Sequence, residues 1–174
     1  MQKVAEIETI LTNYKTVIGK DYSVYKNHIY RIYNSCIKLD NNTKNHKKYA
    51  IAAVFHDLGI WTHNFDYLKP SINLAKEYLI KNKQENWIDE ITLLIDNHHK
   101  ITEFKGSFEI TVNTFRKADW IDVTNGLRLF YFSKNEFKRI KKAFPNKGFH
   151  LFLLKQWFKW FLKKPFNSLP MFKK

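Results

Sequence analysis

Apolar residues recur three and four positions apart along most of the chain, a spacing that places them on one face of an α-helix. The first such run, which predicts a helix ended by Gly19, consists of Val4, Ile7, Leu11, Tyr14 and Ile18. Similar runs predict further helices over about residues 23–39, 46–58, 71–79, 85–97, 110–132, 134–144 and 149–164. Residues 61–69 are expected to form a loop, and Gly126 is a candidate kink or break. No alternating strand pattern or internal repeat stands out, so we predict an all-α fold.

Composition agrees with one domain that has a sizeable core. Of the 174 residues, 44% are apolar and 17% are aromatic, while five glycines and four prolines are too few for a turn-rich β-sandwich. Cys36 has no second cysteine with which to form an internal disulfide, and we expect it to be a core residue. The chain starts without an apolar signal-type stretch and has no uncharged run of about 18 residues. These features favour a protein of the cytoplasm.

Charge is distributed unevenly. The formal net charge is +14, but residues 134–174 hold 12 of the 30 lysines and arginines against Glu136 alone. Residues 1–133 are therefore nearly neutral, and the basic character belongs to a C-terminal extension.

The candidate chemistry begins with His56 and Asp57, which follow the alanine-rich apolar run of residues 50–55. An ionised carboxylate among apolar neighbours is costly to bury unless it is paired or bound to a metal. An imidazole beside a carboxylate suits Zn, Fe, Mn or Co. Neighbouring helical side chains point about 100° apart, so both could reach one ion only where the helix ends, and Gly59 would allow that end. A capped, solvated helix end remains the alternative.

Further ligands lie on other predicted helices. His28 and Asp119 fall on inward faces, and helix bundles build metal sites from side chains that converge in this way. The order His28, then His56-Asp57, then Asp119 within the segment Phe-Arg-Lys-Ala-Asp-Trp-Ile-Asp resembles the HD-domain superfamily of metal-dependent phosphohydrolases. The resemblance covers roughly residues 22–125.

That resemblance implies an HD-type helical bundle over residues 1–133, in which His28, His56, Asp57 and Asp119 hold a metal. We expect one divalent ion, of Mn, Co, Ni, Fe, Zn or Mg. The basic aromatic extension over residues 134–174 would add an amphipathic helix, expected to pack on the same domain.

The implied activity is hydrolysis of a phosphate ester of a small molecule such as a nucleotide. Asp57 or Asp119 could accept the proton of the attacking water, and His98, from the His98-His99 doublet, could protonate the leaving group. Arg31 could fork onto a phosphate. Each has a structural alternative: the doublet could merely close a helix end, and Arg31 could be an exposed helix residue. Asp122 could share the ion, orient a water, or pair with a lysine in solvent.

Other functional classes also fit the sequence. The same scaffold could carry a non-phosphatase metalloenzyme, of the oxygenase or hydratase type, because fold does not fix chemistry. A basic protein that binds nucleic acid or membrane, with a structural or vestigial metal site, is the second alternative. The chain lacks the Glu-Asp doublet of alarmone hydrolases after His56-Asp57, and it lacks the Gly-Tyr-Pro signature of cyclic-di-GMP phosphodiesterases.

The C-terminal helix permits two interpretations. Lysines recur every four residues, at Lys155, Lys159 and Lys163, beside an apolar side that consists of Phe149, Leu153, Trp157, Trp160 and Phe161. The favoured interpretation is that the apolar side packs on the body and the lysines are solvated. The other is a surface that attracts a polyanion, either anionic lipid or nucleic acid.

Overall fold

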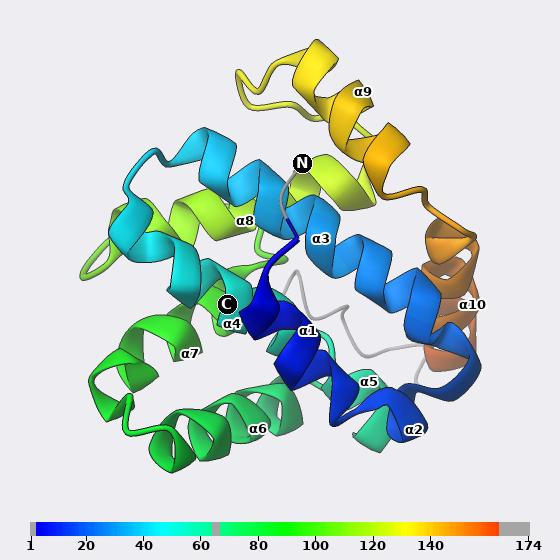
Figure 1. Ribbon diagram of the computed structural model, residues 1–174. Coiled ribbons are helices and arrows are strands. Elements are labelled where there is room, and N and C mark those ends of the chain that lie inside the picture. The colour runs from blue at the N-terminus through cyan, green and yellow to red at the C-terminus, as the bar shows by residue number, and fades with distance from the viewer. Residues whose placement is uncertain (1–2, 64–66, 164–174) are drawn as a thin grey trace.

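The computed structural model describes residues 3–63 and 67–163, and within these ranges the chain is helical and contains no strand (Figure 1). The main helices are α1 (Ala5–Thr12), α2 (Lys15–Ile18), α3 (Tyr22–Leu39), α4 (His46–Phe55), α5 (Gly59–His63), α6 (Leu68–Lys81), α7 (Ile88–Asn97), α8 (Glu109–Val123), α9 (Lys134–Ala143) and α10 (Phe149–Lys163). The all-α prediction is confirmed. None of the described helices is both long and apolar enough to cross a membrane.

The core forms around α3, α4 and α8. Helix α3 packs along α8 and α4, and α4 also contacts α1, α6 and α7 (Figure 1). Every residue of α4 from Tyr49 to Phe55 is buried, because neighbouring helices cover it on all sides. Its three alanines leave room for those helices to approach closely. This burial brings the residues that follow α4 into the centre of the molecule.

The first predicted helix is interrupted, so the expectation of one continuous helix up to Gly19 is wrong. The amides of Asn13 and Tyr14 bond to carbonyls only three residues back, at 3.1 and 3.0 Å, and α2 begins afterwards. The Tyr14 ring packs edge-on against Phe55, with ring centroids 5.9 Å apart. This contact is a tertiary interaction that helical periodicity does not encode.

The segment after α4 also differs from the prediction. Helix α4 ends at Phe55, three residues earlier than expected. The short helix α5 begins at Gly59 and includes residues 61–63, which were predicted to belong to a loop. The Gly59 amide donates to Ser71 Oγ at 2.9 Å, and a Cβ on Gly59 would clash with the Tyr67 carbonyl oxygen. Glycine is therefore needed here for the close approach of two chain segments.

Helix α8 is shorter than the predicted helix over residues 110–132. Its end is set by Asn125 and Gly126, whose φ angles of 55° and 79° are left-handed. The Gly126 amide donates to the Ile121 carbonyl at 2.8 Å, as in a helix terminus closed by glycine. A Cβ on Gly126 would also clash with the Phe137 ring of α9. The chain then runs without a helix to α9.

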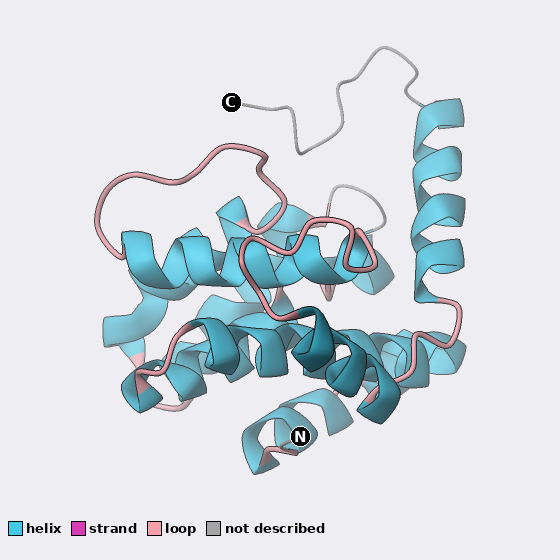
Figure 2. Cartoon of the chain, turned by 90° about the horizontal axis from the view of Figure 1, so that it is seen from above, coloured by secondary structure: helices cyan, strands magenta, loops and turns pink. Residues whose placement is uncertain are grey.

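Helix α10 lies at one edge of the molecule, and its C-terminal half extends beyond the other helices in Figure 2. Its first turns contact the body: Phe149 is buried, and the Phe152 ring stacks on Trp61 with centroids 5.3 Å apart. Leu153 is half-buried. The side chains of Trp157, Trp160, Phe161, Lys159 and Lys163 lie outside the described part of the structure.

Candidate metal centre

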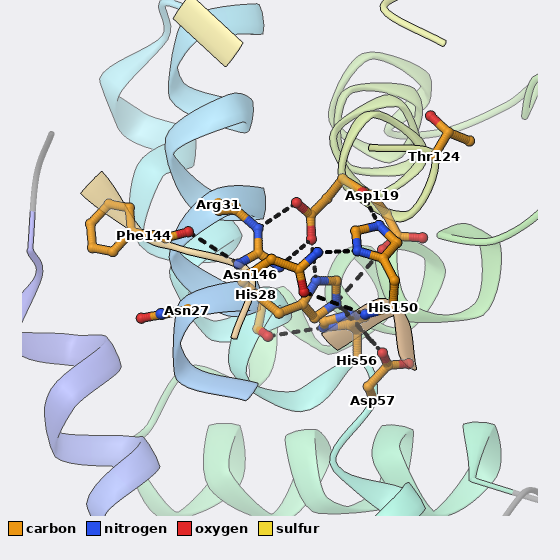
Figure 3. Close-up of polar contacts among 12 residues, drawn as sticks. Asn27, His28, Arg31, His56, Asp57, Asp119, Thr124, Phe144, Asn146 and His150 are labelled. Carbon is orange, nitrogen blue, oxygen red and sulfur yellow. Dashed lines mark hydrogen bonds and ion pairs between the residues drawn. The ribbon is translucent and has the colours of Figure 1, made fainter. Parts of the chain in front are cut away.

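Three helical segments deliver the predicted ligands to one point in the core. His28 comes from the middle of α3, His56 and Asp57 follow the end of α4, and Asp119 comes from α8 (Figure 3). All four side chains are buried. One potential ligand atom from each of His28, His56 and Asp57 lies within 4.8 Å of the others. A buried group of two imidazoles and a carboxylate could hold a metal ion.

The distances within this group are short. His28 Nε2 and His56 Nε2 lie 3.0 Å apart, and Asp57 Oδ2 is 3.3 Å from His56 Nε2 and 3.6 Å from His28 Nε2. Asp119 Oδ1 is 3.9 Å from His28 Nε2. The structure thus brings together all four residues that the sequence singled out as ligands, with Asp119 slightly further away than the other three.

Hydrogen bonds fix which imidazole nitrogens face the centre. His56 Nδ1 must donate to the Ala53 carbonyl oxygen, 2.9 Å away, because a carbonyl can only accept. His28 Nδ1 donates to Asp122 Oδ2 at 2.6 Å. In the neutral rings both Nε2 atoms therefore carry lone pairs. Partners on the far side of the ring orient metal-binding histidines in the same way.

The two facing lone pairs require something positive between them. At 3.0 Å apart, neutral His28 and His56 would repel each other through their Nε2 atoms unless a proton or a cation intervened. Two nitrogens each about 2.1 Å from one ion and roughly 90° apart are separated by about this distance. The ionised Asp57 adds the negative charge that a divalent cation requires. The donor set therefore fits a metal ion.

The two carboxyl groups have different electrostatic environments. Burial alone would raise the pKa of Asp57, but its histidine neighbours His56, His28 and His98 hold it well below its usual range. Burial raises the pKa of Asp119, and the nearby imidazoles only partly offset this effect. Asp57 is therefore the more anionic of the pair.

His98 also faces the centre. Its Nδ1 donates to the Ile95 carbonyl at 2.6 Å, which turns Nε2 toward Asp57, whose Oδ1 lies 3.6 Å away. Burial lowers the pKa of His98, but Asp57 and Asp119 more than compensate and raise it to about 9. The Nδ1 atom of His99 lies 3.4 Å from the same His98 Nε2. Of the doublet, His98 is the histidine beside the predicted ligands.

The Arg31 side chain is bound to other groups of the protein. Its guanidinium is buried and holds Asp122 with two bonds, from Nε to Oδ1 at 2.5 Å and from Nη2 to Oδ2 at 2.9 Å. Its Nη1 donates to the carbonyl oxygens of Phe144 and Pro145. The guanidinium nitrogens Nε, Nη1 and Nη2 thus all donate to protein oxygens, and the prediction that Arg31 contacts a substrate phosphate stays a prediction. Asp122 in turn is buried and is paired with His28 and Arg31.

Sequence reasoning missed residues that surround the centre. The Phe149 ring stacks on His28 with centroids 3.8 Å apart and planes 21° apart, although 121 positions separate them in sequence. His150 Nε2 donates to the backbone carbonyl oxygen of Asp122 at 3.1 Å. Burial and a hydrogen bond to Asp57 raise the pKa of the Tyr67 hydroxyl. No local pattern signals these contacts, because they join segments that meet only in the folded chain.

Asp122→Asn is expected to weaken metal binding about 10- to 100-fold, because Asp122 orients His28 and supports its basicity. The variant also leaves the buried Arg31 without its anionic partner, so it should lower stability. Isothermal titration of the metal-free protein with Zn²⁺ or Mn²⁺, together with thermal denaturation, separates the two effects.

Glu90→Gln is the matched control. Glu90 is buried and its carboxylate lies 2.7 Å from Lys48 Nζ, in an ion pair that does not involve the predicted ligands. The variant should lower stability without changing metal affinity. Equal loss of affinity in both variants would contradict a specific role for Asp122.

Comparison with known proteins yields no relative: no protein-family model matches the chain, and neither a curated protein nor a solved structure matches it. The candidate centre therefore rests on the geometry of its own side chains.

Proposed function

We propose that this chain is a metal-dependent phosphohydrolase of the HD type, which cleaves a phosphate ester of a small molecule such as a nucleotide. The observation that carries this proposal is the convergence of His28, His56 and Asp57, with both imidazole Nε2 atoms turned inward and Asp119 beside them. These four side chains would hold one divalent ion.

A bound divalent ion would supply Lewis acidity, which polarises a phosphoryl oxygen and makes a coordinated water more acidic. The protein's own groups supply the proton transfers. Asp57 or Asp119 can accept a proton from the attacking water, and Asp119, whose pKa burial raises, is the more basic of the two. His98, whose pKa is raised by the neighbouring carboxylates Asp57 and Asp119, can donate one to the leaving oxygen.

Burial of the centre favours a small substrate. Asp57 is the most exposed of the four predicted ligands, and only 6% of its surface is accessible. Phe149 covers His28 on one side, and Tyr67 lies against Asp57 on another. A single phosphoryl group on a small molecule matches this restricted approach better than a polymer backbone does.

Metal analysis and a substrate screen test the proposal. Protein purified without added metal should contain about one divalent ion per chain. After chelation, protein reloaded separately with Mn²⁺, Co²⁺, Ni²⁺, Mg²⁺ or Zn²⁺ should release inorganic phosphate from at least one nucleotide or sugar phosphate. Metal-free protein should release none.

The outcome also distinguishes other classes. Bound metal without phosphatase activity toward the whole panel would contradict the proposal and favour another chemistry on the same scaffold. A redox-active di-iron centre would point specifically to an oxygenase. Absence of bound metal under all five loading conditions would remove the basis for any metalloenzyme.

A further inference from the structure

One face of α10 carries large apolar side chains that no described part of the chain covers. The accessible fractions of these side chains are 55% for Leu151, 57% for Leu154, 54% for Phe158 and 65% for Leu162. Their spacings of three, four and four residues align them along one side of the helix. We call these four residues the apolar stripe.

The body fixes the direction in which the apolar stripe points. Phe149 is only 1% exposed and stacks on His28, while Phe152 stacks on Trp61. At 100° per residue, position 158 lies opposite position 149 around the helix. The side of α10 that is anchored to the body is therefore opposite the side that carries the stripe, and Figure 2 shows no described helix beyond it.

The surroundings of the stripe are strongly basic. Lys155 is exposed beside it, and the sequence places two more lysines at successive turns of the same helix, at positions 159 and 163. Lys147, in the turn before α10, is exposed as well. Glu136 is the single acidic residue from position 134 to the end of the sequence.

We propose that the apolar stripe and its flanking lysines dock α10 on an anionic lipid surface, with the helix lying in the plane of the interface. Helices that bind in this way combine a face of Leu and Phe with a polar side rich in lysine. The leucines and Phe158 enter the boundary between headgroups and acyl chains, while the lysines remain among the anionic headgroups.

Charge and side-chain chemistry favour lipid over two other occupants. A second copy of α10 would bring together two helices that each carry three lysines and no acidic residue, and their repulsion opposes such a dimer. Nucleic acid is bound through lysine contacts and aromatic stacking. Three of the four stripe residues are leucines, which cannot stack on bases. A bilayer satisfies both the apolar stripe and the basic flank.

Vesicle co-sedimentation with the full chain tests this inference. The protein should bind vesicles of phosphatidylcholine mixed with phosphatidylglycerol and bind vesicles of phosphatidylcholine alone much more weakly, and salt should reduce binding. The triple variant Leu154→Gln, Phe158→Gln and Leu162→Gln should weaken binding by about tenfold or more, because apolar burial in the interface is lost.

A matched control carries the same chemical change elsewhere. Ile110, Leu127 and Tyr131 are highly exposed and lie outside α10, so the triple variant Ile110→Gln, Leu127→Gln and Tyr131→Gln should bind vesicles like the wild type. All substituted side chains are exposed, and circular dichroism should show unchanged helical content in both variants.

Several outcomes would overturn the inference. One is that the wild type fails to bind anionic vesicles at low salt, and another is that the stripe variant binds them as well as the wild type does. A third is that the control variant loses as much vesicle binding as the stripe variant. A concentration-dependent dimer that the stripe variant abolishes, without vesicle binding, would assign the stripe to a second copy. Binding to an oligonucleotide that the stripe variant retains, again without vesicle binding, would assign the lysines to nucleic acid.

Discussion

Asp57→Ala is expected to abolish metal binding and, with it, any hydrolytic activity. Asp57 Oδ2 lies within 3.6 Å of both His28 Nε2 and His56 Nε2, and its Oδ1 faces His98. Without the carboxylate, the two inward-facing nitrogens lose the negative charge that offsets a divalent cation. Metal content measured by mass spectrometry should fall from about one ion per chain to background. His56→Ala should have the same effect, because it removes one of the two nitrogens.

Asp57→Asn separates charge from packing. The amide keeps the size of the side chain, so helical content should remain nearly unchanged while metal affinity falls strongly. Asp96→Asn is the control, because Asp96 is a partly exposed residue of α7 that pairs with Lys100 at 3.2 Å. It should retain full metal content. A stoichiometric ion in Asp57→Ala would show that the centre is not the one described above.

His98→Gln is expected to retain the metal but slow turnover by about 10²- to 10⁴-fold, the usual effect of losing a positioned proton donor. His98 Nε2 faces Asp57 from 3.6 Å, yet His98 is not among the three residues whose ligand atoms group most closely. Metal analysis and single-turnover kinetics on whichever phosphate ester is found to be cleaved measure the two properties separately.

His99→Gln provides the comparison within the doublet. Its Nδ1 contacts His98 Nε2 at 3.4 Å, whereas His98 Nε2 itself lies 3.6 Å from Asp57 Oδ1, so the variant should slow turnover less than His98→Gln. A wild-type content of two ions, which falls to one in either variant, would instead make the doublet part of a second metal site. Unchanged turnover in His98→Gln would exclude it as the proton donor.

Periodicity predicted the helices whose packing is regular. The inward stripe of α3, which includes Tyr25, Ile29, Ile32 and Cys36, is buried as expected, and α9 matches its prediction within one residue. Such helices can be predicted from the sequence because one apolar face packs against the core over several turns. The break before α2 was not predicted, since the contact of Tyr14 with Phe55 is tertiary. Gly126 was only a candidate break within residues 110–132, and its tight approach to the Phe137 ring is likewise tertiary.

In the candidate site, too, some residues could be predicted from local sequence and others could not. His28, His56, Asp57 and Asp119 could be selected from residue type, local context and helical position, and they meet in the structure. Asp122 and Arg31 were visible in the sequence but not interpretable, because their roles depend on a bond between α3 and α8. A charged side chain on a helix has the same local signature whether it is solvated or buried with a partner.

The stacking of Phe149 on His28 also bears on the order in which the molecule is assembled. The four predicted ligands precede Phe149 in the chain, and the last of them, Asp119, is synthesised 30 positions earlier. At about 5–20 residues per second, ribosomal synthesis of that interval takes roughly 2–6 s. An interval of the same length separates the exit of Asp119 from the ribosome and the exit of Phe149, and during it the four ligands can meet without an aromatic wall over His28. Ion capture during translation would thus meet a more open centre than ion capture by the finished protein.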